Sequence, residues 1–152
     1  MKKNLISCLL FFIFFSSCGF KPIFSSKNSD FSINEITFVK KNKINTKIEK
    51  KFYSFSDLKN KKRFFELNID ASKQIVTLSK DSKGNELKFE MTVRMDVNFL
   101  ENNQEISTKK YIESFSYNNI SNKFDLSQYE KNIEENLIKK IVQEITEKLY
   151  SF

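Results

Sequence analysis

The sequence predicts an α+β protein, a two-layer sandwich in the order β-α-β-β-β-α, with two helices packed on one face of a four-stranded sheet. Three observations support this prediction. Residues 87–99 alternate strictly between apolar and polar side chains, as a half-buried strand does. Residues 43–56 and 125–150 each repeat apolar residues every three or four positions, as amphipathic helices do. Since every one of these elements has a single apolar surface, we expect the surfaces to bury one another.

The first half of the predicted domain is a strand followed by a helix. Residues 32–40 are rich in β-branched and aromatic side chains and predict the first strand. Asn42 is a candidate N-cap for the helix that follows. Between residues 43 and 56 the apolar residues recur at spacings of four, four and three, which places them on one face and the lysines opposite. These apolar residues are Ile44, Ile48, Phe52 and Phe55.

Three strands are expected to follow as an antiparallel meander. Residues 64–80 predict either one long strand or a bent pair, and residues 81–85 have the composition of a turn. The alternating segment 87–99 is a strand about 43 Å long with one dry face. Residues 105–117 return beside it. On one side of this last strand lie Tyr111, Phe115 and Tyr117.

A long amphipathic helix is predicted for residues 125–150, with Asp125 or Ser127 as its cap. Its length of about 39 Å matches the long strand that it must cover. Its apolar stripe consists of Leu126, Tyr129, Ile133, Leu137, Ile138, Ile141, Val142, Ile145 and Leu149.

The composition excludes several kinds of chemistry. The chain of 152 residues has no His or Trp and only two Gly, so histidine catalysis, His-ligated metals and glycine-rich phosphate loops are not expected. Of the 26 basic residues only Arg63 and Arg94 are arginines. Because arginine is the usual reader of phosphate and guanine, we expect no nucleic-acid partner.

Carboxylate pairs are the remaining candidates for catalysis. Glu134 with Glu135, and Asp96 with Glu90, could in principle serve as acid and base. We expect both pairs on solvated faces among lysines, since charged residues are mostly exposed. We therefore expect no enzyme, no metal and no cofactor.

The first residues have the layout of an export signal. Two lysines precede an apolar run at residues 5–15, which spans about 16 Å as a helix and is too short for the ~30 Å hydrocarbon core. The following Phe15-Ser16-Ser17-Cys18 resembles a bacterial lipobox, in which the thiol receives a diacylglycerol. Leu5-Ile6-Ser7-Cys8 fits the same pattern, but cleavage there would leave an apolar run of only three residues ahead of it, so Cys18 is the better site.

These features predict three segments. Residues 1–17 form a lipoprotein signal peptide, residues 18–30 a lipidated N-terminal linker, and residues 31–152 a single α+β domain. The alternative is a plain signal in which Cys18 is a small buried residue.

The residues from Cys18 onward resemble a known family. Cys18-Gly19-Phe20-Lys21-Pro22-Ile23-Phe24 is similar to the Cys-Gly-Phe-basic-Pro-aliphatic-aromatic opening of LPS-assembly lipoproteins of the LptE type. The order and length of the predicted elements are also similar. The resemblance implies a non-enzymatic outer-membrane lipoprotein, anchored on the periplasmic side. Such a protein plugs an LptD-like β-barrel, assists its assembly, and binds lipopolysaccharide. Only Cys18 is carried over from the family as a site residue.

Basic residues concentrate in one part of the sequence. Residues 40–63 have a net charge of +8, and the rest of the chain from Cys18 onward sums to −3. Clustered cations attract the phosphates of a lipid head, whereas scattered charges are screened within ~8 Å. The candidates for binding lipopolysaccharide are Lys50, Lys51, Lys61, Lys62, Arg63 and, as a weaker one, Arg94. The alternative is that these residues form the solvated side of the first helix, near an anionic membrane.

Two other functions remain open at this level. One is a lipid-anchored periplasmic carrier or sensor for a small apolar ligand, which a pocket in a stable monomer would favour. The weaker one is an envelope hydrolase that uses carboxylates.

Overall fold

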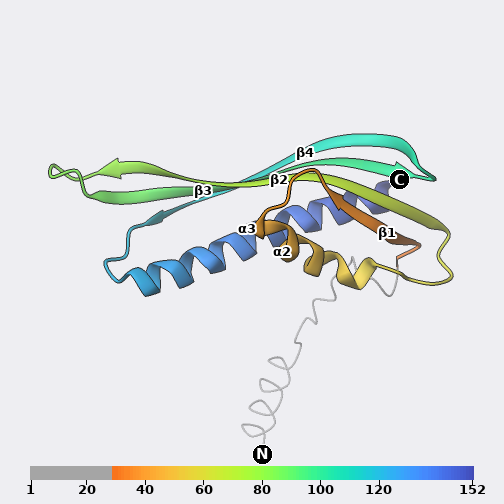
Figure 1. Cartoon of the computed structure of the whole chain (residues 1–152), viewed down its shortest axis with the longest axis horizontal. Coiled ribbons are helices and arrows are strands. Elements are labelled where there is room, and N and C mark those ends of the chain that lie inside the picture. Colours follow the sequence, from red (N-terminus) through yellow and green to blue (C-terminus); the bar gives the residue numbers. More distant parts are fainter. Residues whose placement is uncertain (1–28) are drawn as a thin grey trace, which may run out of the picture.

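A computed structural model of the chain describes residues 29–152, and the predicted fold class is confirmed. Both helices lie on one side of a four-stranded sheet, as Figure 1 shows. Cys18 and the predicted signal peptide lie outside the described residues. In chain order the elements are β1 (Phe31–Phe38), α2 (Lys43–Phe52), the 3-10 helix η2 (Tyr53–Phe55), β2 (Arg63–Lys80), β3 (Glu86–Glu101), β4 (Gln104–Asn118) and α3 (Lys123–Ser151).

The sheet has the strand order β1-β2-β3-β4. β1 and β2 are parallel, with Phe31 opposite Arg63 and Phe38 opposite Ile69, and α2 belongs to the crossover that a parallel pair requires. β2, β3 and β4 form the expected antiparallel meander. The segment 64–80 is therefore one strand rather than a bent pair, with register shifts only near its end, between Thr77 and Lys80.

The core lies between the sheet and the helices. The inward residues of β3 from Phe89 to Phe99 are buried, as their alternation predicts, and they meet the buried stripe of α3. Each such side chain contributes about 1.5–3 kcal/mol by leaving water. The inward residues of β3 that are buried are Phe89, Met91, Val93, Met95, Val97 and Phe99. Leu87, expected to belong to this row, is 48% exposed.

One end of the molecule is closed by aromatic rings. The ring of Phe31, at the start of β1, lies 5.0 Å from that of Tyr150 in α3 and 5.8 Å from that of Phe55 in η2. The ring centre of Phe152 lies 5.8 Å from the ring centre of Phe65 on β2. These contacts join the start of β1, the end of α2 and the end of α3 at the same end of the molecule (Figure 1).

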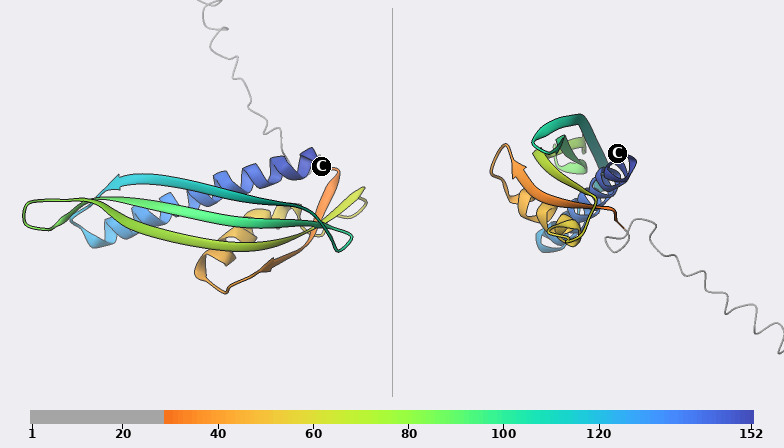
Figure 2. Two further views of the ribbon diagram at one scale, coloured as in Figure 1. Left: turned by 90° about the horizontal axis from the view of Figure 1, so that it is seen from above. Right: turned by 90° about the vertical axis from the view of Figure 1, so that its right-hand side faces the viewer.

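The other end is formed by the β2–β3 hairpin, which reaches past the first turn of α3 in Figures 1 and 2. Here β1 no longer pairs with β2, and four apolar side chains of the hairpin are exposed. They are Ile75, Val76, Leu78 and Leu87.

The cap of α3 differs from the prediction. The helix begins at Lys123, and the side-chain oxygen of Asn122 accepts a hydrogen bond from the backbone N–H of Phe124 at 3.0 Å. Asn is as good a cap as Asp or Ser, so residue type could not choose among them. Asp125 lies in the first turn, where its charge is favourable toward the helix dipole.

Candidate functional site

The basic segment 40–63 is divided among several surfaces in the structure. Lys50 and Lys51 are exposed on the last turn of α2. Lys61 donates from Nζ to the carbonyl of Ser29 at 2.6 Å, and Lys62 forms an exposed ion pair with Asp30 at 3.4 Å. These two lysines therefore hold the loop before β2 against the chain that leads into β1.

Arg63 is occupied by a structural ion pair. Its Nε and Nη2 donate to the two carboxylate oxygens of Glu101, both at 2.7 Å, and its guanidinium lies 4.7 Å from the ring centre of Phe65. The hydrogen bond to Glu101 raises the pKa of Arg63, against a smaller effect of desolvation. The same bond lowers the pKa of Glu101. The fork of donors that would suit a phosphate is thus already used between β2 and β3.

Arg94 lies on the opposite surface from the α2 lysines. Its neighbours Val93 and Met95 are buried against the helices, so its own side chain belongs to the outer face of the sheet. Its register partners are Ser72 on β2 and Ile112 on β4. The structure does not bring Arg94 together with the other five candidates.

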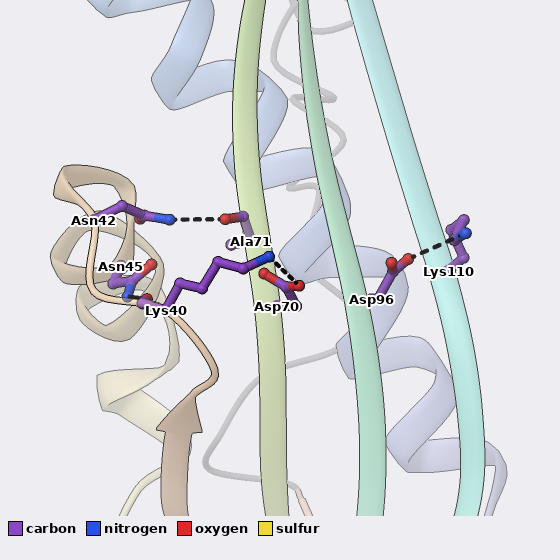
Figure 3. Close-up of polar contacts among 7 residues, drawn as sticks. All are labelled: Lys40, Asn42, Asn45, Asp70, Ala71, Asp96 and Lys110. Carbon is purple, nitrogen blue, oxygen red and sulfur yellow. Dashed lines mark hydrogen bonds and ion pairs between the residues drawn. The ribbon is translucent and has the colours of Figure 1, made fainter.

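Lys40 is also drawn to the outer face, as Figure 3 shows. Asp70 and Asp96 lie directly opposite each other on β2 and β3. Two like charges in such positions repel each other and destabilise the strand pair. Lys40 approaches Asp70 at 3.0 Å from one side, and Lys110 approaches Asp96 at 3.8 Å from the other. The four charges balance, so this part of the outer face carries no net charge.

Glu134 was expected to be solvated, and that expectation is wrong. Its side chain is 9% exposed and lies between Lys47 of α2, at 2.9 Å, and Lys73 of β2, at 2.8 Å. Burial alone would raise the pKa of Glu134, but the hydrogen bonds from Lys73 and Lys47 outweigh it and hold the pKa below its usual value. The sequence contained a signal for this burial, because the apolar Ile138 follows Glu134 by four residues and therefore lies on the same face of the helix. Glu134 joins α2, α3 and β2 and is structural.

The lysines at the end of α2 and in the loop before β2 form a cationic surface, which we call the lysine end. Within residues 29–152, the ammonium groups of three of its lysines make neither an ion pair nor a hydrogen bond, and Tyr53 beside them is 82% exposed. It lies at the end of the molecule where β1 begins (Figure 1). The lysine end consists of Lys50, Lys51, Lys59, Lys61 and Lys62.

A groove runs between the free edge of β4 and α3. It has a volume of about 480 Å³, and Phe115 of β4 lies in it with 45% of its surface exposed. Lys140, at its rim, pairs with Glu113 at 3.3 Å. The α3 side chains that line it are Tyr129, Asn132, Ile133, Asn136, Leu137, Lys139, Lys140 and Gln143.

A tyrosine beside this groove is tied to α3. Tyr117 packs edge-on against Tyr129 at 5.9 Å and donates its hydroxyl to Glu130 at 2.7 Å. Desolvation, together with this hydrogen bond, raises the pKa of Tyr117. The phenol is thus a neutral structural donor that fixes the start of α3 on β4.

Metal ligation and membrane spanning are the remaining properties to consider in residues 29–152. No group of three or more Asp, Glu, His or Cys side chains is placed to hold a metal ion there. Within the same range, none of the helices combines the length and apolar content that crossing a membrane requires.

The fold has counterparts among solved structures. The rare lipoprotein B from Shewanella oneidensis is 13% identical, with a TM-score of 0.56 over 78% of this chain and 95% of that chain. An uncharacterized lipoprotein B from Nitrosomonas europaea is 16% identical, with a TM-score of 0.60 over 88% and 92%. A minor lipoprotein from Acinetobacter baumannii is 13% identical, with a TM-score of 0.57 over 79% and 91%. Neither protein-family models nor curated proteins match the sequence.

At these identities the likeness concerns the fold. The chain has the helix-backed sheet of structurally known bacterial lipoproteins, and it covers nearly the whole of each one.

Proposed function

We propose that this chain is a non-enzymatic, lipid-anchored lipoprotein on the periplasmic side of the outer membrane. In this proposal it plugs an LptD-like β-barrel, assists the barrel's assembly, and binds lipopolysaccharide during insertion at the cell surface. The supporting observation is a combination: an elongated fold shared with bacterial lipoproteins, in a chain whose Cys18 opens an LptE-like motif.

The shape and outer surface support a role as a plug. β3 is about 53 Å long and α3 about 44 Å, so the domain is a rod comparable with the thickness of a membrane. The outer face of the sheet is polar, with hydrogen bonds between Thr92 and Ser114 at 2.8 Å and from Thr108 to Asn98 at 3.1 Å. The interior of a wide membrane barrel is polar as well.

The test of this function is purification of the protein from solubilised membranes, with identification of what it retains. We expect a large outer-membrane β-barrel protein and lipopolysaccharide to accompany it. Recovery of the protein alone, as a stable monomer without either, would contradict the proposal.

The proposed anchor is tested on the same material. We expect the mass of the N-terminal peptide to show cleavage before Cys18 and a diacylglyceryl group on its sulfur. Several acyl chains would hold the protein firmly, whereas one binds only marginally. An unmodified cysteine in the membrane fraction, or cleavage at another residue, would refute the anchor.

Lipopolysaccharide binding is proposed to use the exposed cations. We expect a joint change of Lys50, Lys51, Lys61 and Lys62 to Gln to weaken binding and reduce its dependence on salt, since phosphate attraction is electrostatic. Arg94→Gln is the comparison on the outer face. Unchanged affinity in the lysine variant together with a loss in Arg94→Gln would transfer the site to the outer face.

The groove beside β4 favours a second function, an anchored carrier for a small apolar ligand. Its volume is within the ~300–1,000 Å³ range of ligand sites, and its floor contains aromatic and aliphatic side chains. Asn136→Trp, at an exposed position of the groove, would fill it, so a carrier would lose its ligand while a plug would still retain its barrel.

A further inference from the structure

The lysine end combines unpaired charge with an exposed aromatic ring. Lys50, Lys51 and Tyr53 come from the end of α2 and from η2, and Lys59 lies in the next loop. Among residues 29–152 no ion pair or hydrogen bond engages the ammonium groups of these three lysines. Lysines around an exposed tyrosine are typical of surfaces that meet the headgroup layer of a membrane.

The lysine end is also where the chain leads into the domain. Lys61 contacts the carbonyl of Ser29 and Lys62 pairs with Asp30, so the first described residues are fixed to this loop. Figure 2 shows the start of β1 at the end of the rod opposite the hairpin tip. Cys18 precedes Ser29 by eleven residues, which reach at most ~40 Å when fully extended. A lipid on Cys18 therefore tethers the rod at the lysine end, within ~40 Å of the membrane.

We infer that the lysine end rests on anionic phospholipid headgroups of the leaflet that holds the anchor. The inference depends on the lipid anchor of the proposed function, and not on the barrel. Each lysine near an anionic surface increases partitioning roughly fivefold, and a tether raises the local concentration of that surface. The contact orients the rod, because it fixes one end at the headgroups and directs the hairpin tip away from them.

The hairpin tip provides the comparison that the inference needs. Within residues 29–152 it also has three exposed lysines whose ammonium groups have no ion-pair or hydrogen-bond partner, but Asp81 and Glu86 lie between them in the sequence and no aromatic ring of the tip is exposed. It is at the far end of the rod from the start of β1. The tip lysines are Lys80, Lys83 and Lys88.

The experiment measures hydrogen exchange on the full mature protein, inserted through its lipid into vesicles. One set contains phosphatidylcholine alone and the other adds phosphatidylglycerol. We expect exchange in residues 50–62 to slow at least about fivefold in the anionic vesicles, as the gain from a single lysine predicts. Exchange in residues 80–88 is expected to be equal in both sets.

Two triple variants carry the same change of charge. The test variant should lose the protection of residues 50–62, whereas the control variant should keep it. The test variant combines Lys50→Gln, Lys51→Gln and Lys59→Gln. The control variant combines Lys80→Gln, Lys83→Gln and Lys88→Gln.

Three outcomes would overturn the inference. Residues 50–62 could be protected equally in the neutral and the anionic vesicles, or the test variant could keep their protection. The third outcome is protection only when lipopolysaccharide replaces phosphatidylglycerol in the vesicles. The last would make the lysine end a lipopolysaccharide site alone. The mass of the protein reports lipidation separately. A chain found without lipid refutes the anchor, and the same comparison with preformed vesicles then still decides whether the lysine end contacts anionic lipid.

Discussion

The two halves of β2 differ in burial although both are rich in apolar residues. In residues 63–71, the clamped half, Phe65, Leu67 and Ile69 are fully buried. In residues 72–80, the free half, the apolar side chains are exposed by more than a third. The strand is the same, so the difference comes from its neighbours. Burial of an apolar side chain depends on what the fold places against it, and not on the pattern alone.

The boundary between the halves is set by the crossover from β1 to α2. The N–H of Val39 donates to the carbonyl of Ile69 at 3.1 Å, and the side-chain amide of Asn42 donates to the carbonyl of Ala71 at 2.8 Å. Figure 3 shows the Asn42 contact at the edge of β2. Asn42 is the residue before α2, as predicted, but its side chain makes no cap bond to the helix. Beyond Ala71, β3 is the only strand of the described chain that pairs with β2.

The largest expected effect distinguishes the two halves on one face of β3. Val93→Asp should cost about 4 kcal/mol or more, because it places an unpaired charge where the wild-type side chain is 0% exposed. Leu87→Asp, on the same face beside the free half, should cost under about 1 kcal/mol. Chemical denaturation measures both free energies of unfolding.

Thr92→Asp is the control for the choice of face. Thr92 points outward next to Val93, and its change to Asp should be mild. Equal losses in Val93→Asp and Leu87→Asp would show that the hairpin is as tightly packed as the clamped half.

An intermediate effect is expected where α2 and α3 close over β2. Glu134→Gln should cost about 2 kcal/mol, since it leaves Lys47 and Lys73, both partly exposed, without their shared counter-charge. Glu135→Gln, next in sequence and not in an ion pair of the described chain, should be near neutral.

The same carboxylate gives a pH dependence with a definite sign. The pKa of Glu134 is lower in the folded protein than its unfolded value of about 4.3. Its contribution is therefore complete above that value and is lost as the pH falls through the folded pKa. Between pH 5 and pH 3, the melting temperature of the wild type should fall more steeply than that of Glu134→Gln. Parallel curves would contradict the role of the pair.

The smallest effect is expected at the tip of the hairpin. Gly84 has φ +85°, a conformation that a side chain strains, although nothing lies within 4 Å of an added Cβ. Gly84→Ala should cost about 1 kcal/mol or less and speed hydrogen exchange near the tip alone. Ser82→Ala, exposed in the same turn, is the control. Faster exchange throughout the sheet would show that the tip is coupled to the clamped half.

Much of the architecture could be predicted because periodicity reports which face of an element is apolar. The row from Phe89 to Phe99 and the stripe of α3 both follow it. The site was less accessible to prediction. The prediction from the net charge of +8 over residues 40–63 treated these cations as one group. In the structure Lys40, Lys47 and Arg63 each have a carboxylate partner from a distant part of the chain.

The sequence by itself determined the order of elements, the inward face of each one and the candidate anchor at Cys18, because these depend on residues close together along the chain. Only the tertiary structure decided that β1 lies parallel to β2, that Glu134 is buried and that the free half of β2 is uncovered. It also separated Arg94 from the lysine end. Those features depend on which distant segments meet, since a charge is neutralised, and an apolar side chain covered, only by a neighbour that the fold brings to it.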